Sequence, residues 1–435
     1  MVAARPRVLL LGEASNPEWV SVPRVGYCHA AALARHAHVH LVTQVRNRDA
    51  LVRHGWREDE DFTAIDSEAV ARTMWKLGGL LRGGADRGWT TVTALSWPSY
   101  LYFEELAWQR FGHRIAAGEW DVVHRVTPVS PALPSPMARR VRATGVPFVV
   151  GPLNGGVPWP RGFTHLRRRE GEWLSSLRDL HRLMPGYGAT RRHASALVVA
   201  SRITWRQIPR RYRDRCVYIP ENAVDPVSFA GTPGPVRKGP MGVVFVGRLV
   251  PLKCADVLVE AAAPLCRAGA LRVDLVGDGP ERERLQALIC QLGLEGSVRL
   301  LGWVPHEDLL ARLVDYDAFG FPSVREFGGG AVLEAMAAGL APIVVDYAGP
   351  GEIVSETSGY RVPLGPRSSL VEGFRRVLGR MVDRPDEVAA KGRGARRRVE
   401  RHFTWDAKAA QMLRVYDWVR GHRGKPDFGM PFADG

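Results

Sequence analysis

Short apolar runs that lead into glycine or proline recur along the C-terminal half of the chain, and this pattern predicts buried strands. Such runs begin the segments 242–253, 271–285 and 298–304, and a further run, YDAFGFPS, ends at Ser323. Each run is short and apolar, as expected for a strand inside a sheet. Three successive strand-and-loop units followed by a fourth loop indicate half of a doubly wound α/β domain.

The residues after the fourth run change from a strand pattern to a helix pattern. AVLEAMAAG, residues 331–339, contains strong helix formers and ends on Gly339, a typical C-terminal stop. Residues 325–330 are therefore predicted to form a strand-to-helix loop. In open α/β sheets, ligands bind in such loops, where helix N-termini offer free backbone N–H groups to phosphate.

Apolar runs also predict a sheet in the N-terminal half. Residues Arg7–Gly12, His38–Thr43, Trp120–His124 and Val146–Val150 have the pattern of strands and together favour a Rossmann-like domain. Between the first two runs, Val25–Ala37 has the pattern of a loop and a first helix.

Composition fits a chain with separate cores in a reducing compartment. The chain has 435 residues and 46% hydrophobic content, enough for two or three domains. The apolar run at Val8–Gly12 is too short for a secretory segment, and no run approaches the ~18 residues needed to span a membrane. The five cysteines are scattered and odd in number, which favours a cytoplasmic protein over a disulfide framework or a zinc site.

Positive charge is concentrated in one segment. The chain carries a net charge of +15, and residues 161–215 hold fourteen arginines against four acids, a local charge of +10. Such a segment suits nucleic acid, an anionic membrane face or a phosphorylated acceptor, or it reflects a GC-rich genome. No nucleic-acid module accompanies it, so nucleic acid is disfavoured. Because Trp173 and several leucines are interleaved, peripheral contact with an anionic membrane is the favoured use.

Two carboxylates and two cations are the candidate chemical groups of the C-terminal half. Glu326 and Glu334 flank the glycines Gly328, Gly329 and Gly330, so both could reach one polar ligand. Arg248 and Lys253 follow the first strand of this half and suit a diphosphate, because Arg offers a fork of donors and Lys a mobile point charge. The alternatives are a solvated helix face for Glu334 and surface cations beside an ordinary turn.

A nicotinamide or flavin dinucleotide site is disfavoured, because Arg282 stands where GDGPER would need its third glycine. An Asp-x-Asp pair at Asp315 and Asp317 could chelate a divalent metal. It lies directly before a predicted strand, where aspartate commonly marks an element boundary, so no metal site is expected.

The order of these motifs resembles the donor domain of the retaining glycosyltransferase family 4. The order is GR, four residues, K, then GDGPE, GWV, FPS and E-FGGG-AVLEAMA, with ENAVD before it and FTWDAKAAQMLRVYDWV after it. The resemblance implies a GT-B fold, two facing Rossmann-like domains with a cleft between them and a C-terminal helix that crosses back to the first domain. The expected domains are 1–220 for the acceptor, 221–404 for the donor and 405–422 for the crossover helix.

The resemblance also implies roles for individual residues. Arg248 and Lys253 would hold the nucleotide diphosphate, Glu326 would meet the transferred sugar and Glu334 would bind the ribose. The remaining expected donor contacts are made largely by backbone and comprise Gly247, Gly277, Val304, Gly328, Gly329 and Gly330.

On the acceptor side, Gly26, Asn154 and Gly155 are expected in loops at the sheet edge. His124 ends a strand where the family commonly has His-x-His, but Val126 replaces the second histidine. His124 either orients a hydroxyl or packs under the sheet, since a lone histidine is often structural.

The expected activity is a retaining transfer of a sugar from a nucleoside-diphosphate sugar to an acceptor hydroxyl, with no cofactor and no metal. A UDP-sugar is favoured as donor over a GDP-sugar, and a lipid-linked or envelope glycan is favoured as acceptor over a small natural product. The enzyme would work in the cytoplasm or on the inner face of the cell membrane. The alternatives are a sugar-nucleotide epimerase, a phosphorylase, a non-catalytic nucleotide-sugar binder and a polyanion-binding protein.

Overall fold

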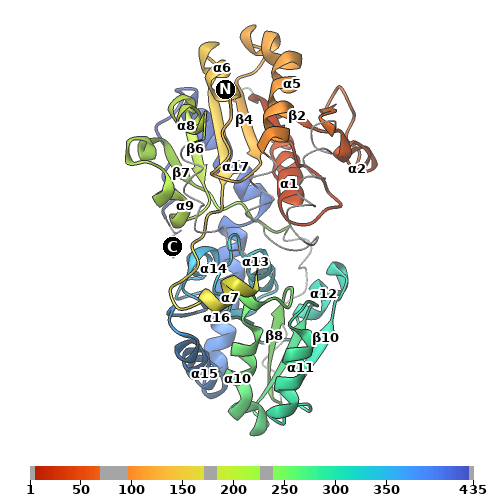
Figure 1. The fold of residues 1–435 in the computed structure, drawn as a ribbon, viewed down its shortest axis with the longest axis vertical. Coiled ribbons are helices and arrows are strands. Elements are labelled where there is room, and N and C mark those ends of the chain that lie inside the picture. The colour runs from red at the N-terminus through yellow and green to blue at the C-terminus, as the bar shows by residue number, and fades with distance from the viewer. Residues whose placement is uncertain (1–4, 69–96, 171–183, 226–238, 431–435) are drawn as a thin grey trace. The chain divides into compact units, whose positions relative to one another are not determined.

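The computed structural model describes residues 5–68, 97–170, 184–225 and 239–430, which fold into two compact units (Figure 1). The first unit consists of Met1–Gly156, Gly171–Glu221 and Trp405–Met430, and the second of Val157–Glu170, Asn222–Thr404 and Pro431–Gly435. The expected N-terminal domain, 1–220, includes residues 157–170. The structure assigns this short segment to the second unit, because it packs against loops of that unit.

The first unit is built on a parallel sheet. Its seven strands lie in the order β3-β2-β1-β4-β5-β6-β7. Their bounds are β1 Arg7–Gly12, β2 His38–Gln44, β3 Phe62–Ile65, β4 Val122–Thr127, β5 Phe148–Leu153, β6 Ala196–Val199 and β7 Cys216–Tyr218. The four strands predicted in this half of the sequence are confirmed as β1, β2, β4 and β5.

Helices cover both faces of this sheet with apolar side chains. They are α1 Val22–Ala34, α2 Arg48–Arg53, α5 Trp97–Ala116, α6 Met137–Ala143, α8 Tyr187–His193, α9 Arg202–Gln207 and α17 Trp405–Val419, with the 3-10 turns η1 Val45–Asn47 and η3 Arg210–Arg215. Helix α17 buries Met412 and Tyr416 against Leu33 of α1 and Leu10 of β1. The predicted C-terminal helix therefore does pack on the N-terminal domain, as the GT-B resemblance implies.

The second unit is built on a second parallel sheet. Its six strands lie in the order β10-β9-β8-β11-β12-β13. Their bounds are β8 Met241–Val246, β9 Leu271–Val276, β10 Val298–Gly302, β11 Ala318–Phe321, β12 Ala341–Val345 and β13 Tyr360–Val362. The strand order reverses between β8 and β11, because the chain builds β9 and β10 on one side of β8 and then returns to the other. Ligands bind open α/β sheets at the carboxyl ends of strands at such a reversal.

The helices of the second unit are α7 Thr164–Arg169, α10 Ala255–Arg267, α11 Arg282–Gln291, α12 His306–Leu313, α13 Gly330–Ala337, α14 Ala348–Ile353, α15 Arg367–Asp383 and α16 Pro385–His402, with the 3-10 turn η5 Pro251–Lys253. The helix predicted over 331–339 is confirmed as α13, and Gly339 after it has φ +85°, which favours glycine. In the described ranges, every helix is too short or too polar to cross a membrane.

Candidate active site

Backbone hydrogen bonds connect the loops after β8 and β9 at the carboxyl edge of the second sheet. The N–H groups of Gly247 and Leu249 donate to the carbonyls of Val276 and Asp278, at 3.0 and 2.8 Å. A Cβ atom on Gly277 would lie 2.0 Å from the carbonyl oxygen of Gly247, so only glycine permits this approach. The predicted importance of Gly247 and Gly277 thus has a structural basis within the chain itself.

This joining fixes the backbone on both sides of Arg248. The side chain of Arg248 is exposed, and within the described part of the chain it forms no ion pair. An exposed guanidinium on a backbone that is fixed in this way is well suited to an external anion.

Lys253 ends the short turn η5 and contacts Glu326. Its Nζ atom donates a hydrogen bond to the Glu326 carboxylate and lies 4.6 Å from the centre of the Phe321 ring. The two side chains are only 17% and 19% exposed. Two predicted site residues that stand 73 positions apart in the sequence therefore meet, because β8 and β11 are neighbours in the sheet.

The backbone before Lys253 is held by the loop after β11. The carbonyl oxygen of Leu252 accepts hydrogen bonds from the backbone N–H of Val324 at 3.1 Å and from the hydroxyl of Ser323 at 3.3 Å. The loops that carry Lys253 and Glu326 thus share backbone contacts as well as an ion pair, and the position of one depends on the other.

The glycine run caps helix α13. Gly329 has φ +60° and stands at the N-cap, and its carbonyl accepts from Leu333 N at 3.1 Å. A Cβ on Gly349 of α14 would lie 2.1 Å from the carbonyl of Phe327, so α14 packs tightly on this loop. The first N–H groups of α13 have no partner inside the helix and can donate to an anion.

Glu334 lies one turn inside α13 and is 25% exposed at its side chain. Its Oε1 atom is 3.8 Å from Nε2 of His306, the first residue of α12. His306 was not predicted as a site residue from the sequence, although it directly follows the GWVP motif. Val304 of that motif is partly buried, whereas Trp303 is 74% exposed at the end of β10.

Arg325 is a second residue that was not predicted as a site residue from the sequence. It is only 8% exposed and lies next to Glu326. Its Nε atom donates to the carbonyl of Val157 at 3.0 Å, and its guanidinium carbon lies 5.0 Å from the centre of the Trp159 ring. An arginine beside a glutamate gives no sequence signal for burial, because both are common on surfaces.

His124, predicted as a catalytic candidate, is completely buried inside the first unit. Its Nδ1 atom is 2.7 Å from the Tyr416 hydroxyl and its Nε2 atom is 2.6 Å from the carbonyl of Gly151. Burial lowers the pKa of His124 well below its ordinary value, and the neighbouring His29 lowers it further. Because both ring nitrogens are engaged and no face is open to solvent, the structure favours the packing alternative over a role in orienting a substrate.

The predicted acceptor-side residues also make contacts inside the first unit. A Cβ atom on Gly26 would lie 2.4 Å from the carbonyl of Ala14, so glycine allows α1 to approach the loop after β1. The Nδ2 atom of Asn154 donates to Glu221 Oε2 at 2.6 Å, and its Oδ1 accepts from Gly155 N at 2.9 Å. These contacts give Asn154 a structural role that the sequence did not reveal, and its role toward an acceptor stays a prediction.

The Asp-x-Asp pair is joined to the edge of the sheet. Asp317 Oδ2 accepts from Gly242 N at 2.8 Å, and Asp317 N donates to Gly242 O at 2.9 Å. The intervening Tyr316 donates to Asp274 at 2.7 Å. One carboxylate of the pair is therefore used to align β8 with the chain entering β11.

Comparisons with known proteins show similarity to glycosyltransferases. Residues 234–393 match the family model for glycosyl transferases group 1. WcaL of Escherichia coli, a glycosyltransferase assigned to colanic acid biosynthesis, is 33% identical over 41% of this chain and 46% of its own length. The 2-deoxystreptamine glucosyltransferase of Streptomyces kanamyceticus is 29% identical over 48% of this chain and 56% of its own. The chain thus aligns with about half the length of these relatives.

Solved structures are similar over nearly the whole chain. HepE of Anabaena in complex with UDP gives a TM-score of 0.60 at 16% identity and covers 94% of this chain and 99% of its own. A glycosyltransferase from Rickettsia africae gives a TM-score of 0.61 at 14% identity and covers 96% and 99%. At these identities the similarity concerns the fold alone, and it confirms the predicted GT-B architecture of two Rossmann-like domains.

Proposed function

We propose that this chain, whose residues 234–393 match the family model for glycosyl transferases group 1, transfers a sugar from a nucleoside-diphosphate sugar to an acceptor hydroxyl. The observation that carries the proposal is the meeting of Lys253 and Glu326 at the reversal between β8 and β11. The exposed Arg248 on the loop after β8 and the N–H groups at the start of α13 supply further donors for a diphosphate.

In the proposed reaction, the bond between the anomeric carbon and the diphosphate oxygen breaks as a bond to the acceptor oxygen forms. The acceptor proton passes to the departing phosphate on the same face of the sugar, so the anomeric configuration is retained without a protein nucleophile. Negative charge grows on the diphosphate in the transition state. Arg248 and Lys253 would stabilise this charge, and positioning would supply most of the remaining acceleration.

Glu326 has two effects in this scheme. It holds the Lys253 ammonium group in place, and it presents a carboxylate toward the sugar that reacts. An incoming diphosphate competes with Glu326 for Lys253, so part of the binding free energy is used to rearrange this pair. Glu334, one turn into α13, would accept hydrogen bonds from the ribose hydroxyls.

A UDP-sugar is the favoured donor, with a GDP-sugar as the alternative. Similarity to WcaL supports an envelope or exopolysaccharide glycan as acceptor, and similarity to 2-deoxystreptamine glucosyltransferase supports a small natural product as the alternative. Thermal unfolding in the presence of UDP-, GDP- and TDP-sugars identifies the donor, because a ligand at ~100 times its dissociation constant adds ~2.7 kcal/mol. If none of these donors protects the protein, the proposal fails.

Product analysis distinguishes transfer from epimerisation. With the stabilising donor and no acceptor, a transferase yields at most slow hydrolysis, whereas an epimerase converts the donor into a stereoisomer with its diphosphate intact. Addition of a panel of lipid-linked and free sugar acceptors should then release the nucleoside diphosphate in step with a glycosylated product. Formation of a donor stereoisomer without release of nucleotide would contradict the transferase proposal and support an epimerase.

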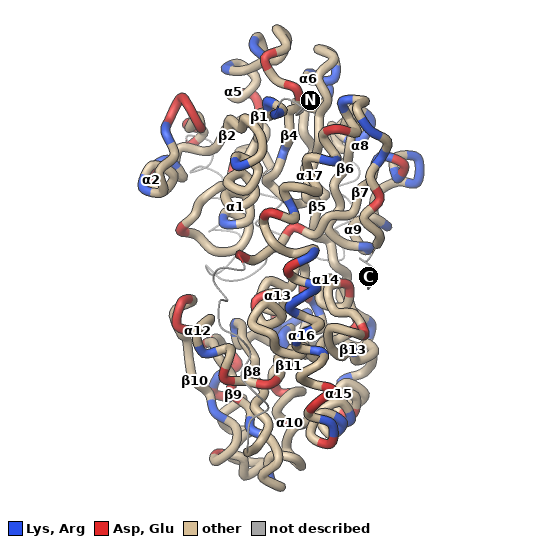
Figure 2. Tube along the Cα trace, turned by 180° about the vertical axis from the view of Figure 1, so that it is seen from behind, with Lys and Arg blue, Asp and Glu red and all other residues tan. Residues whose placement is uncertain are grey.

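Peripheral contact with an anionic membrane is a further part of the proposal. Arginines gather along α8, α9 and the chain around β7 (Figure 2), and Arg206, Arg210 and Arg211 are exposed there. Trp173 and the leucines expected beside this charge lie outside the described residues. Each cation near an anionic surface contributes ~1 kcal/mol. The protein should therefore sediment with phosphatidylglycerol vesicles but not with phosphatidylcholine vesicles at low salt, and equal sedimentation with both would contradict this part.

A further inference from the structure

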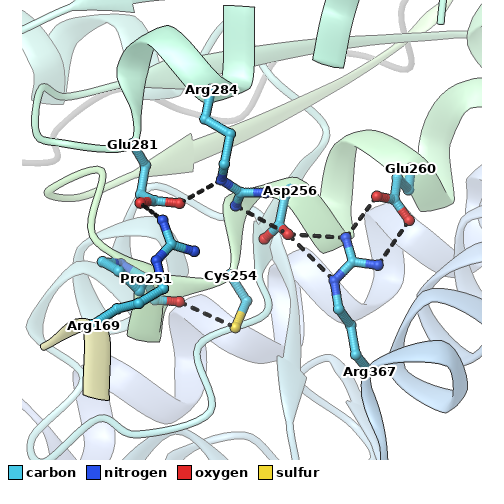
Figure 3. A network of polar contacts seen from close by, with 8 residues as sticks. All are labelled: Arg169, Pro251, Cys254, Asp256, Glu260, Glu281, Arg284 and Arg367. Atoms are coloured by element: carbon cyan, nitrogen blue, oxygen red, sulfur yellow. Dashed lines mark hydrogen bonds and ion pairs between the residues drawn. The ribbon is translucent and has the colours of Figure 1, made fainter. Parts of the chain in front are cut away.

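An alternating network of arginines and carboxylates connects α7 to the loops of the second unit (Figure 3). Arg284 joins Glu281 to Asp256, with contacts of 2.7 and 3.1 Å, and Arg367 joins Asp256 to Glu260, with contacts of 2.9 and 2.6 Å. Arg169, the last residue of α7, donates to Glu281 and completes the network. The network therefore links α7 to the N-terminal ends of α10, α11 and α15.

Two of the three carboxylates of this network are largely buried, whereas Glu260 is 29% exposed. The side chains of Glu281 and Asp256 are 6% and 11% exposed, against 42% for Arg169. Burial alone would raise the pKa of Asp256, but Arg284 and Arg367 overcome this effect and hold it below its ordinary value. Each buried charge thus has a partner, as stability requires.

A cavity of about 200 Å³ lies under α7 within this network. Phe163 and Leu166 cover one side of it, and Cys254 and Asp256 line it from the start of α10. Cys254 directly follows Lys253 and has φ +50°, a left-handed conformation that a cysteine rarely adopts. The backbone next to Lys253 is therefore held in an unfavourable conformation by its surroundings.

The segment Val157–Glu170 contacts the residue that precedes each member of the proposed reacting pair, through the backbone of one and the side chain of the other. At its C-terminal end, the Glu170 carboxylate accepts from the backbone N–H of Leu252, the residue before Lys253, at 3.0 Å. At its N-terminal end, the carbonyl of Val157 accepts from Arg325, the residue before Glu326, at 3.0 Å. The Pro158 carbonyl accepts from the hydroxyl of Tyr347 at 2.8 Å.

The geometry points to residues Val157–Glu170 as a brace that positions Lys253 and Glu326, with Glu170 and Arg169 as its positioning residues. This inference rests on the proposed function for its catalytic consequence. Lysine is flexible, so the location of its ammonium group depends on the backbone that carries it. A displacement of ~1 Å in a catalytic group can cost ~100-fold in rate. The brace supplies one of the three hydrogen bonds described above to Leu252, the other two being made to its carbonyl by Ser323 and Val324.

The kinetic test is a double-mutant cycle between Glu170 and Lys253 in the full chain. We expect Glu170→Ala to lower kcat ~10- to 100-fold. Glu170→Gln should stay within ~3-fold of the wild type, because the amide oxygen still accepts from Leu252 N. In a Lys253→Ala background, Glu170→Ala should have almost no further effect, because the group that it positions is gone. Arg168→Ala, at an exposed position of α7 two residues before Glu170, is the matched control and should be silent.

Additive losses of kcat in the double mutant would overturn the inference, since they would show that Glu170 does not act through Lys253. If Glu170→Ala does not fold, Arg169→Leu takes its place in the cycle, because it breaks the neighbouring contact to Glu281 at the same end of the segment. Arg169→Lys is then the conservative variant.

Hydrogen exchange tests the brace independently of activity. Backbone amides of residues 249–254 should exchange ~10-fold faster in Glu170→Ala than in the wild type. In Arg168→Ala, their exchange rates should equal those of the wild type. Unchanged exchange in Glu170→Ala would refute the brace even if the enzyme transfers sugars. Faster exchange in a protein whose wild type binds no nucleotide sugar would instead refute the proposed function and support the brace.

Discussion

Replacing each of the two glutamates by glutamine should change nucleotide affinity in opposite directions. Glu326 is paired with Lys253, and both side chains are less than one fifth exposed. A nucleoside diphosphate must displace this carboxylate from Lys253 or accept it as a neighbour of like charge. Glu326→Gln removes that competition and keeps the size of the side chain. We therefore expect Glu326→Gln to bind the nucleoside diphosphate more tightly than the wild type.

The magnitude follows from the environment of the pair. Two unit charges at ~4 Å interact by ~1 kcal/mol in water and by ~4 kcal/mol at the effective dielectric constant of a protein surface. Burial strengthens the attraction between Lys253 and Glu326, but each charge has lost hydration, which offsets part of that attraction. We therefore take ~1–2 kcal/mol as the net effect of Glu326 on nucleotide binding, or ~5- to 30-fold in the dissociation constant. Glu334→Gln instead weakens a hydrogen bond between the ribose and a charged acceptor, which is worth ~1.5–3 kcal/mol.

The measurement is isothermal titration calorimetry at 50 and 200 mM salt. The ligand is the nucleoside diphosphate that protects the wild type most against thermal unfolding. Higher salt should reduce the gain in Glu326→Gln more than the loss in Glu334→Gln. Steady-state kinetics should show a lower kcat for Glu326→Gln and mainly a raised KM for Glu334→Gln. Weaker nucleotide binding by Glu326→Gln would refute the competition between Glu326 and the diphosphate for Lys253, and two silent variants would show that the donor binds elsewhere.

Three further outcomes are expected. Arg248→Ala should raise the barrier to turnover by ~3 kcal/mol with little loss of stability, because Arg248 is exposed; wild-type kcat in the purified variant would exclude a role on the diphosphate. Asp256→Asn should lower the free energy of unfolding at pH 7 by ~2 kcal/mol. This is less than the ~3–5 kcal/mol for a buried charge left wholly unpaired, because Arg284 and Arg367 keep other partners. As a control, Glu372→Gln in an exposed ion pair should lower it by less than ~0.5 kcal/mol. The pKa of Asp256 is lower in the folded than in the unfolded protein. Its contribution to stability is therefore complete above the unfolded pKa of ~3.9 and is lost as pH falls through the folded pKa. The difference in free energy of unfolding between Asp256→Asn and the wild type, measured by urea denaturation, should shrink only in that acidic range. Activity should persist in excess EDTA if Arg248 and Lys253 neutralise the diphosphate, and complete loss restored by manganese would overturn this assignment.

Local patterns in the sequence predicted much of the second unit. Short runs rich in Val, Leu and Phe correspond to β8, β9, β10 and β11, because a buried strand requires little more than a brief apolar stretch between turn residues. Glycines marked the close approaches, since Gly277 has a positive φ beside the backbone of Gly247 and Gly329 has a positive φ beside the side chain of Ile353. Arg248, Lys253 and the two glutamates could be proposed as site residues from the sequence, because their residue types suit a diphosphate and a sugar; their roles stay predictions.

Contacts between distant segments were decided only by the tertiary structure. Lys253 and Glu326 pair because the order of the sheet places β8 beside β11, and no local pattern encodes which strands become neighbours. His124 has the sequence position of a site residue but is buried, because Tyr416, 292 residues later, packs over it.

The segment Val157–Glu170 shows most clearly that contacts between distant residues cannot be inferred from the sequence. Its arginines contribute to the basic stretch 161–215, which as sequence indicates only a charged surface. In the structure, Arg169 instead joins the buried carboxylate of Glu281, and Glu170 accepts from Leu252 N. Sequence alone determines which residues can be buried in strands and which carry charge. The fold decides which charges are paired, because pairing depends on distances between elements that are far apart along the chain.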